Sequence, residues 1–237
     1  MTPSLQHIAI IMDGNRRWAK NKHIPSAMGH AAGARRVRSV VQACADRGIA
    51  FITLFAFSTE NWQRPADEVS GLLGLLIHYL EKEVKDMNAN GVRLRIIGDT
   101  SPFDDRLQKL MRDSQEKTAG NTRITLTIAA NYGGRWDMVQ AVKNWQTAHP
   151  DRLLNQLHPD DLQPHLSMAY APDPDLIIRT GEEVRLSNFL MWQSAYSELF
   201  FTPTLWPDFT PEKLDESIKW FAERDRRFGG SSQKKLA

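Results

Sequence analysis

The stretch His7-Ile-Ala-Ile-Ile-Met-Asp-Gly-Asn-Arg-Arg-Trp-Ala19 decides how the rest of the chain is read. Its apolar run, Ile8 to Met12, predicts a buried strand that stops at a carboxylate, a glycine, an amide and two guanidinium groups. Ligands of open α/β sheets bind beyond the carboxyl ends of the strands. We therefore expect Asp13 to hold a divalent cation, and Arg16 and Arg17 to clamp phosphate oxygens. On this segment alone, an exposed turn with solvated arginines fits equally well.

Length and composition are those of a globular protein. The 237 residues, 41% hydrophobic and 24% charged, can bury a substantial core. The net charge of +2 lacks the basic footprint of a nucleic-acid-binding protein, so we expect no nucleic-acid partner. The single cysteine, Cys44, excludes an internal disulfide and fits a reducing compartment such as the cytoplasm. No apolar stretch approaches the roughly 20 residues that span a bilayer.

Apolar runs alternate with helical patterns along the chain. After the first strand, further strands are predicted at residues 51–57, 92–97, 124–130, 175–178 and 198–201. Helices are predicted at residues 29–48, 65–91, 102–118, 136–148 and 211–224, with one or two short helices within 151–168. Because parallel strands need crossover connections, this alternation predicts a single α/β domain with a mostly parallel central sheet of about six strands, flanked by helices.

Polar residues follow four of the predicted strands. Asp13, Ser58, Asn131 and Arg179 stand at strand ends among glycine, aromatic and basic residues. The carboxyl ends of parallel strands share one edge of a sheet, so we expect these residues to converge there. The helix predicted to begin at the turn Gly29–Gly33 is expected to offer a second anion site.

The helix predicted at residues 65–91 is apolar on more than one side. Besides one stripe at helical spacing, Leu75, Ile77 and Tyr79 carry apolar character onto other faces. A helix buried by protein on two sides is the commoner source of such a pattern. The wall of a hydrocarbon tunnel is the sharper alternative.

The loop Arg179-Thr-Gly-Glu-Glu-Val-Arg-Leu-Ser-Asn188 contains two arginines, six residues apart, that can close on one phosphate group. A solvated loop with a surface Glu–Arg pair is the alternative. Several arginines with few candidate nucleophiles favour diphosphate binding with a divalent metal over acyl transfer. No P-loop, serine-hydrolase or zinc-protease motif is present in the sequence. Asn15 stands where an aspartyl phosphatase carries its second aspartate.

Together these motifs resemble those of the cis-prenyltransferase family, and within it the bacterial undecaprenyl diphosphate synthases, or isoprenyl transferases. The matching pieces, in family order, are residues 7–19, 29–33, 57–65, 94–100, 128–137, 179–190, 198–209 and 226–230. The resemblance implies a catalytic domain over residues 1–230, a loose tail at 231–237, and an apolar tunnel between the sheet and two helices. The D-D-x-x-D motif of the trans-prenyltransferases is absent from the sequence.

The resemblance implies Mg²⁺-dependent, sequential cis-condensation of isopentenyl diphosphate onto an allylic diphosphate such as farnesyl diphosphate. The expected product is a polyprenyl diphosphate, such as undecaprenyl diphosphate for the cell-wall lipid carrier. A homodimer is also implied. The composition favours a cytoplasmic location, and so apolar a product suggests peripheral membrane contact for its release. The alternatives are a noncatalytic prenyltransferase-like subunit and a lipid-diphosphate binding protein.

The functional residues of the family match positions in this chain. Asp13 and Asn61 match catalytic positions, Asn61 in proton removal, and Asp13 is expected to share the metal with Glu198. The substrate-binding matches are Gly14, Asn15, Arg16, Arg17, Trp18, Ser26, His30, Ser58, Thr59, Glu60, Trp62, Arg64, Arg179, Arg185, Leu186 and Ser187. Gly14 to Arg17 and His30 match the allylic diphosphate site, and Arg179, Arg185 and Ser187 match the isopentenyl diphosphate site. Residues 226–230 resemble the segment that reaches the partner subunit's site.

Two positions depart from the family pattern. Ser26 stands where an arginine usually contacts diphosphate, and Glu182 occupies the place of the second glycine in R-T-G-G-E. A carboxylate that faced the diphosphate would weaken substrate binding, whereas one that faced solvent would not. We expect activity to be retained, because Asp13, Glu198 and the matching arginines are present.

Overall fold

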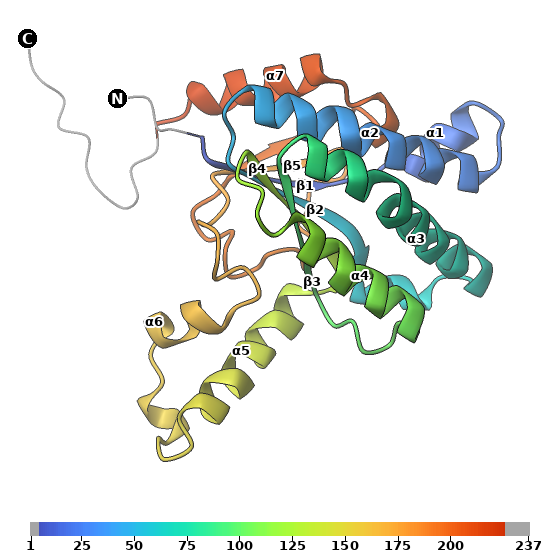
Figure 1. The fold of residues 1–237 in the computed structure, drawn as a ribbon. Helices are drawn as coiled ribbons and strands as arrows, with labels where there is room; N and C mark the ends of the chain where they lie inside the picture. The colour runs from blue at the N-terminus through green and yellow to red at the C-terminus, as the bar shows by residue number, and fades with distance from the viewer. Residues whose placement is uncertain (1–4, 226–237) are drawn as a thin grey trace, which may run out of the picture.

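All six predicted apolar runs form strands. They are β1 (His7–Ile11), β2 (Phe51–Ser58), β3 (Val92–Ile97), β4 (Ile124–Tyr132), β5 (Leu176–Arg179) and β6 (Glu198–Phe201). In the computed structural model, which describes residues 5–225, the strands pair in the order β3-β4-β2-β1-β5-β6 (Figure 1). Every neighbouring pair is parallel, which confirms the predicted sheet. Residues 226–230 and the tail at 231–237 lie outside the described residues.

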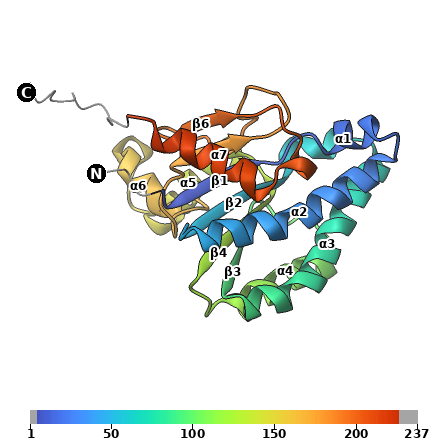
Figure 2. The same cartoon turned by 90° about the horizontal axis from the view of Figure 1, so that it is seen from above.

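Helices and loops cover both faces of the sheet. On one face lie α2 (Ser26–Asp46), α3 (Ala66–Ala89), α4 (Asp105–Thr118) and α7 (Pro211–Ala222), which share the larger hydrophobic core with the strands (Figure 2). The other face is covered by α5 (Gly134–Ala148) and by the loops that precede and follow β5. The short elements are α1 (Asn15–Asn21), α6 (Pro159–Leu162), η1 (Thr59–Gln63), η2 (Leu154–Gln156), η3 (Gln163–His165) and η4 (Trp206–Asp208). β1 and β5 are buried on both faces, which explains the apolar runs at residues 8–11 and 176–178; His7 and Arg179, the polar ends of these strands, are hydrogen-bonded.

The start of α2 differs from the prediction. The helix begins at Ser26, so Gly29 and Gly33 lie inside it rather than in a turn before it. A Cβ atom at Gly29 would lie 2.2 Å from the backbone oxygen of Asn15, and one at Gly33 would lie 2.2 Å from Asn15 Oδ1. The two glycines therefore allow α1 to pack closely against α2. The helix start predicted at Gly29 is therefore wrong, whereas the anion site expected there remains a prediction, and His30 faces the cavity from the second turn of α2.

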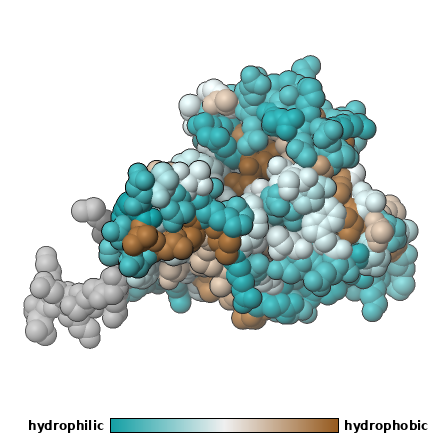
Figure 3. All heavy atoms as spheres, turned by 90° about the horizontal axis from the view of Figure 1, so that it is seen from below, coloured by the Kyte–Doolittle hydropathy of each residue, from teal (hydrophilic) through white to brown (hydrophobic). Residues whose placement is uncertain are grey.

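A cavity of about 1550 Å³ is lined by the sheet, α2 and α3. Its mouth is polar and lies at the carboxyl ends of β1, β2 and β5, whereas its interior is lined by apolar side chains such as Leu54, Leu72, Leu76 and Ile128. We call this cavity the chamber. It is the apolar space predicted between the sheet and two helices. On the surface seen from below, apolar residues gather in a central hollow and along one lobe (Figure 3).

The two alternatives for α3 apply to different parts of the helix. Leu80, Val84 and Met87 are buried in protein, whereas Leu72 and Leu76 line the chamber. One helix therefore needs apolar residues on several faces, as its sequence shows. Among the residues that the structure describes, no helix is long and apolar enough to cross a membrane.

Candidate active site

The polar mouth of the chamber forms where two neighbouring strands end. β1 lies between β2 and β5, and Ile11 is in register with Arg179. After β1 the chain turns toward α1 and α2, whereas after β5 it enters a loop that packs on the opposite face of the sheet. Divergence of this kind opens a crevice at the carboxyl edge of a parallel sheet. Asp13 lies in this crevice, two residues beyond Ile11.

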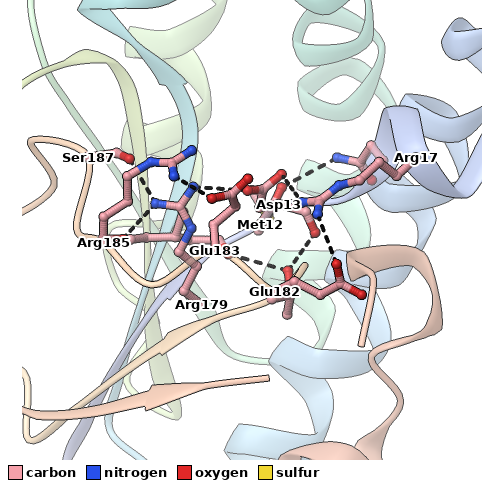
Figure 4. A network of polar contacts seen from close by, with 11 residues as sticks. Met12, Asp13, Arg17, Arg179, Glu182, Glu183, Arg185 and Ser187 are labelled. Atoms are coloured by element: carbon pink, nitrogen blue, oxygen red, sulfur yellow. Dashed lines mark hydrogen bonds and ion pairs between the residues drawn. The ribbon is translucent and has the colours of Figure 1, made fainter. Parts of the chain in front are cut away.

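Asp13 lies between two arginines (Figure 4). Arg179 Nη2 donates to Asp13 Oδ2 at 2.9 Å, and Arg17 Nη2 lies 3.2 Å from Asp13 Oδ1. The guanidinium of Arg179 is only 6% exposed, and its Nη1 donates to Ser187 Oγ at 2.7 Å and to the carbonyl oxygen of Arg185 at 2.6 Å. A carboxylate and two oriented guanidinium groups thus face the mouth, and these are the groups that bind Mg²⁺ and diphosphate oxygens.

Two glycines make this close approach possible. Gly14 has φ 107° and Gly181 has φ 87°, a region of backbone conformation that favours glycine. A Cβ atom at Gly181 would lie 2.7 Å from Arg17 Nη2 and 3.0 Å from the carbonyl carbon of Asp13. The hydroxyl of Thr180 donates to the carbonyl oxygen of Asp13 at 2.7 Å. The loops after β1 and β5 are therefore fastened to each other directly behind the carboxylate.

A second group of charged side chains surrounds Glu68, in the first turn of α3. Arg64 Nη1 donates to Glu68 Oε1 at 2.9 Å, Arg16 Nη1 lies 3.6 Å from Oε2, and His30 Nε2 lies 3.8 Å from Oε1. Burial lowers the pKa of His30; Glu68 acts in the opposite direction, while Arg64 and Arg16 lower the pKa further. Glu68 is only 15% exposed and gathers three cationic or titratable side chains from three elements. Nothing in the sequence singles it out, because the helix dipole alone explains an acidic residue in a first turn.

The loop after β5 has an unusual backbone. Glu182, Ser187, Asn188 and Leu190 all have positive φ angles, from 41° to 71°, although none is glycine. Such conformations are costly for L residues and gather at functional sites. Arg185 lines the chamber mouth as predicted, but its guanidinium is paired with Glu183 while its carbonyl oxygen contacts Arg179. The closure of both arginines on one phosphate group remains a prediction.

Glu182 lies at the rim of the site rather than fully in solvent or inside the mouth. Its Oε2 is 3.8 Å from Arg17 Nη1, and its side chain is 68% exposed. Ser26, the other departure from the family pattern, is the first residue of α2 and lines the chamber. The missing arginine therefore leaves one positive charge fewer at the mouth.

Most of the predicted substrate-binding residues line the chamber. With Asp13 and Asn61 they are Gly14, Asn15, Arg16, Arg17, Ser26, His30, Ser58, Glu60, Arg64, Arg179, Arg185, Leu186 and Ser187. Lining residues that the sequence did not reveal include Arg135, Glu183 and Asn188.

Three predicted binding residues do not line the chamber. Trp18 Nε1 donates to Asp208 at 2.8 Å, and Trp62 Nε1 donates to the buried Asn131 at 2.9 Å while its ring packs on Phe57. Thr59 faces Gly133, where its Oγ1 would lie 2.8 Å from an added Cβ atom. These side chains support the loops around the mouth. Asn131 was also predicted to join the site, but it does not line the chamber and instead accepts the hydrogen bond from Trp62 behind the mouth.

Asn61 has a structural partner. Its Oδ1 accepts a hydrogen bond from the Ser58 N–H at 3.0 Å, as part of the reciprocal capping of η1. An amide offers hydrogen bonds but has no basic site for a proton at neutral pH. Its neighbour Glu60 accepts from Asn188 Nδ2 at 2.9 Å. Partial burial alone would raise the pKa of Glu60, but hydrogen bonds from Asn188, its own backbone and two hydroxyls lower it overall.

Glu198 lies at the opposite end of the sheet from Asp13. It begins β6 in register with Leu176, which is in register with Ile8. Asp13 lies five residues further along this direction, a separation of roughly 16 Å at about 3.3 Å per residue. The prediction that Glu198 shares a metal with Asp13 is therefore wrong within one subunit. Over residues 5–225, no three His, Cys, Asp or Glu side chains gather in a metal-binding cluster.

Comparison with known proteins assigns the chain to a family. A family model described as undecaprenyl diphosphate synthase matches residues 11–229. An isoprenyl transferase of Nitrosomonas europaea is 51% identical over 228 residues, which cover 96% of this chain and 86% of that protein. The ditrans,polycis-undecaprenyl-diphosphate synthase ((2E,6E)-farnesyl-diphosphate specific) of Escherichia coli K12 is 52% identical over 228 residues, covering 95% and 90%.

The fold agrees with these relatives. The crystal structure of lavandulyl diphosphate synthase from Lavandula x intermedia, in complex with dimethylallyl diphosphate, matches with a TM-score of 0.90 at 30% identity. The match covers 94% of this chain and 98% of that one. With the family model, the relatives and the fold in agreement, the chain belongs to the undecaprenyl diphosphate synthase family of prenyltransferases.

Proposed function

We propose that the protein condenses isopentenyl diphosphate repeatedly, with cis geometry, onto farnesyl diphosphate and releases undecaprenyl diphosphate. The observation that supports this most directly is a single cavity with two unlike ends. Asp13, Arg17 and Arg179 face its mouth, while its interior is apolar along β2 and α3. A substrate with a diphosphate head and a hydrocarbon tail fits both ends at once.

The two clusters of charge at the mouth fit two diphosphate groups. We assign the allylic diphosphate to the side of α1 and α2, where Arg16, Arg17 and His30 line the cavity. Isopentenyl diphosphate is assigned to the loop after β5, where Arg179 and Ser187 are already joined by a hydrogen bond. Asp13 lies between the two assigned sites.

The residues at the mouth also fit Mg²⁺. Protein sites hold this ion through one or two carboxylates, with substrate phosphates and water completing the shell. Asp13 is such a carboxylate, 30% exposed and facing the mouth, and within residues 5–225 no group of three or more His, Cys, Asp or Glu side chains offers another metal site. We propose that Asp13 binds Mg²⁺ together with substrate diphosphate. When bound, the ion neutralises charge on the diphosphate leaving group.

The side chains at the mouth promote loss of the allylic diphosphate. Arg16, Arg17 and His30 donate to the oxygens on which negative charge develops as the bond to the allylic carbon breaks. The double bond of isopentenyl diphosphate attacks that carbon, and the new chain then gives up a proton to an oxygen of the diphosphate that has left. We propose that Asn61 orients the isopentenyl group for this step rather than taking the proton itself. The apolar walls keep water away from the cationic carbon.

We further propose that the protein is a cytoplasmic homodimer that contacts the membrane peripherally when it releases product. β6 is an edge strand, and the exposed apolar side chains near it include Tyr196 and Leu199. An exposed edge with apolar neighbours is a suitable surface for a second subunit. A long polyprenyl product is too apolar to leave into water.

Radiolabelled isopentenyl diphosphate tests the proposed function. The purified protein is incubated with farnesyl diphosphate and Mg²⁺, and the products are separated by chain length. We expect 55-carbon products, and none after chelation with EDTA. The same assay without farnesyl diphosphate is the control. An absence of product from the folded, Mg²⁺-supplied protein would instead support a noncatalytic subunit.

A further inference from the structure

Asn188, in the loop after β5, contacts two other segments at the mouth of the chamber. Its Nδ2 donates to Oε1 of Glu60, in η1 after β2, at 2.9 Å. Its Oδ1 accepts a hydrogen bond at 3.0 Å from the N–H of Arg135, at the start of α5 after β4. All three residues line the chamber. One half-buried side chain thus joins the segments that follow three strands of the sheet.

The start of α5 has no side-chain cap of its own. Its N-cap residue is Gly133, which offers no side-chain acceptor, although the first N–H groups of a helix have no partner within the helix. The carbonyl oxygen of Asn188 accepts from the Gly134 N–H at 2.6 Å, and its side chain accepts from the next N–H, that of Arg135. Asn188 therefore caps α5, although it lies 53 residues beyond Arg135 in the sequence.

The backbone around Asn188 leaves room for these contacts and holds them in place. A Cβ atom at Gly133 would lie 2.7 Å from Asn188 Nδ2 and 2.8 Å from Thr59 Oγ1. Asn188 has φ 64°, a left-handed conformation that asparagine adopts more readily than most L residues do. Phe189, the next residue, is fully buried and stacks on Phe55 with ring centroids 4.5 Å apart. The loop is therefore fixed to its neighbours at this point.

Ser187, which precedes Asn188, faces Arg179 (Figure 4). Its Oγ accepts a hydrogen bond from Arg179 Nη1 at 2.7 Å, and these are the two residues to which we assign isopentenyl diphosphate. A single peptide unit joins Ser187 to Asn188, whereas the residues assigned to the allylic diphosphate belong to α1 and α2. A displacement of Asn188 would therefore disturb the isopentenyl side of the mouth first.

We propose that Asn188 is a positioning residue for isopentenyl diphosphate. By holding the loop after β5 against η1 and α5, it keeps Ser187 and Arg179 in the arrangement that binds the diphosphate. This inference rests on the proposed function, which assigns isopentenyl diphosphate to that loop. Groups that are already held in place lose less freedom when a substrate binds. A loop released from η1 and α5 would have to be ordered by the substrate, and isopentenyl diphosphate would bind more weakly.

Steady-state kinetics with both substrates test this role. Asn188→Asp keeps the size of the side chain and an acceptor for the Arg135 N–H, but it replaces the donor to Glu60 with a second carboxylate. We expect the KM for isopentenyl diphosphate to rise about ten-fold, and that for farnesyl diphosphate to stay within about two-fold of the wild type. Asn144→Asp makes the same change at an exposed position of α5 and should alter neither KM.

Exchanging the two functional groups supplies a rescue. In the double variant Glu60→Gln with Asn188→Asp, the new amide at position 60 can donate to the new carboxylate at position 188. The hydrogen bond returns with donor and acceptor reversed, and the repulsion between two carboxylates is removed. We expect the KM for isopentenyl diphosphate in the double variant to lie within about three-fold of that in Glu60→Gln alone.

Thermal unfolding shows which variants are folded. Asn188→Gly accepts the positive φ without strain and removes both side-chain hydrogen bonds. An unchanged KM for isopentenyl diphosphate in folded Asn188→Asp and Asn188→Gly would overturn the inference. So would an equal rise in KM for both substrates, or a double variant no better than Asn188→Asp, because Asn188 would then support the fold in general. An inactive wild-type protein would instead contradict the proposed function.

Discussion

Arg17 illustrates how charged residues compete with one another at the mouth of the chamber. It lies 3.2 Å from Asp13 and 3.8 Å from Glu182, so an incoming diphosphate must compete with two carboxylates for one guanidinium. The Glu182 side chain is 68% exposed, and solvent screens its attraction for Arg17. Its backbone has φ 71°, a left-handed conformation that costs an L residue roughly 1 kcal/mol. Glu182 therefore combines a small electrostatic cost for binding with a small cost for stability.

Two substitutions separate these costs. Glu182→Gln removes the charge alone, whereas Glu182→Gly removes both the charge and the backbone strain. We expect each variant to lower the KM for the allylic diphosphate roughly two- to five-fold, matching an exposed ion pair of about 0.5–1 kcal/mol. Only Glu182→Gly should raise the free energy of unfolding in urea, by up to about 1 kcal/mol. An unchanged or higher KM in both variants would show that this carboxylate does not compete with substrate.

Site residues that directly follow a strand could be predicted from the sequence, whereas residues that hold other site side chains in place could not. Asp13 and Arg179 were predictable because each stands at the end of an unbroken apolar run. Glu68 was not, because its three partners come from separate elements and meet only in the fold. Glu198 was misplaced for a related reason. A motif shows that a residue belongs to a strand, whereas the register decides at which edge of the sheet it lies.

Among the elements, the strands were the most predictable, and the helix starts were the least. β1 and β5 are covered on both faces, and residues 8–11 and 176–178 within them are accordingly all apolar. The start of α2 was missed because glycine suggests a turn when the neighbouring helix is not yet known. In the structure, Gly33 is a contact surface for α1. α3 was ambiguous in sequence because it serves the core and the chamber at different points along its length.

The role of Gly33 predicts opposite effects for two glycine-to-alanine changes. In Gly33→Ala, the new Cβ would lie 2.2 Å from Asn15 Oδ1 and 2.8 Å from the Trp206 ring, so we expect a loss of roughly 1–3 kcal/mol in unfolding free energy. Gly71, within α3, has no atoms within 4 Å of such a Cβ. Gly71→Ala should therefore stabilise the protein by about 0.5–1 kcal/mol. Urea unfolding measures both changes, and a Gly33→Ala variant as stable as the wild type would refute the packing role.

At the scale of the whole molecule, the sheet separates Asp13 and Glu198 by its full strand length. β6 is an edge strand, so Glu198 lies near the edge of the sheet to which we assign the second subunit. If Glu198 contributes to a metal site, geometry requires that it serve the Asp13 of another subunit. This arrangement would make the dimer, rather than the single chain, the unit of activity.

Mixed dimers test this arrangement. Asp13→Ala and Glu198→Ala chains carrying different affinity tags are expressed together, and the heterodimer is purified through both tags. If Glu198 acts across the interface, one of the two sites keeps both carboxylates, and about half of the wild-type activity per dimer should return. The two variant homodimers are the controls and should be inactive. A silent heterodimer, or an active Glu198→Ala homodimer, would remove Glu198 from the partner's site.

The claim on which the proposed mechanism most depends is that Asp13, held by Arg17 and Arg179 at the mouth of the chamber, is the catalytic carboxylate. Turnover of Asp13→Asn with isopentenyl diphosphate, farnesyl diphosphate and Mg²⁺ tests it most directly, because asparagine keeps the size of the side chain and removes its charge. We predict that kcat falls by on the order of 10²-fold or more while the folded variant still binds farnesyl diphosphate. Turnover within a few-fold of the wild type would contradict this assignment and move the chemistry away from the end of β1.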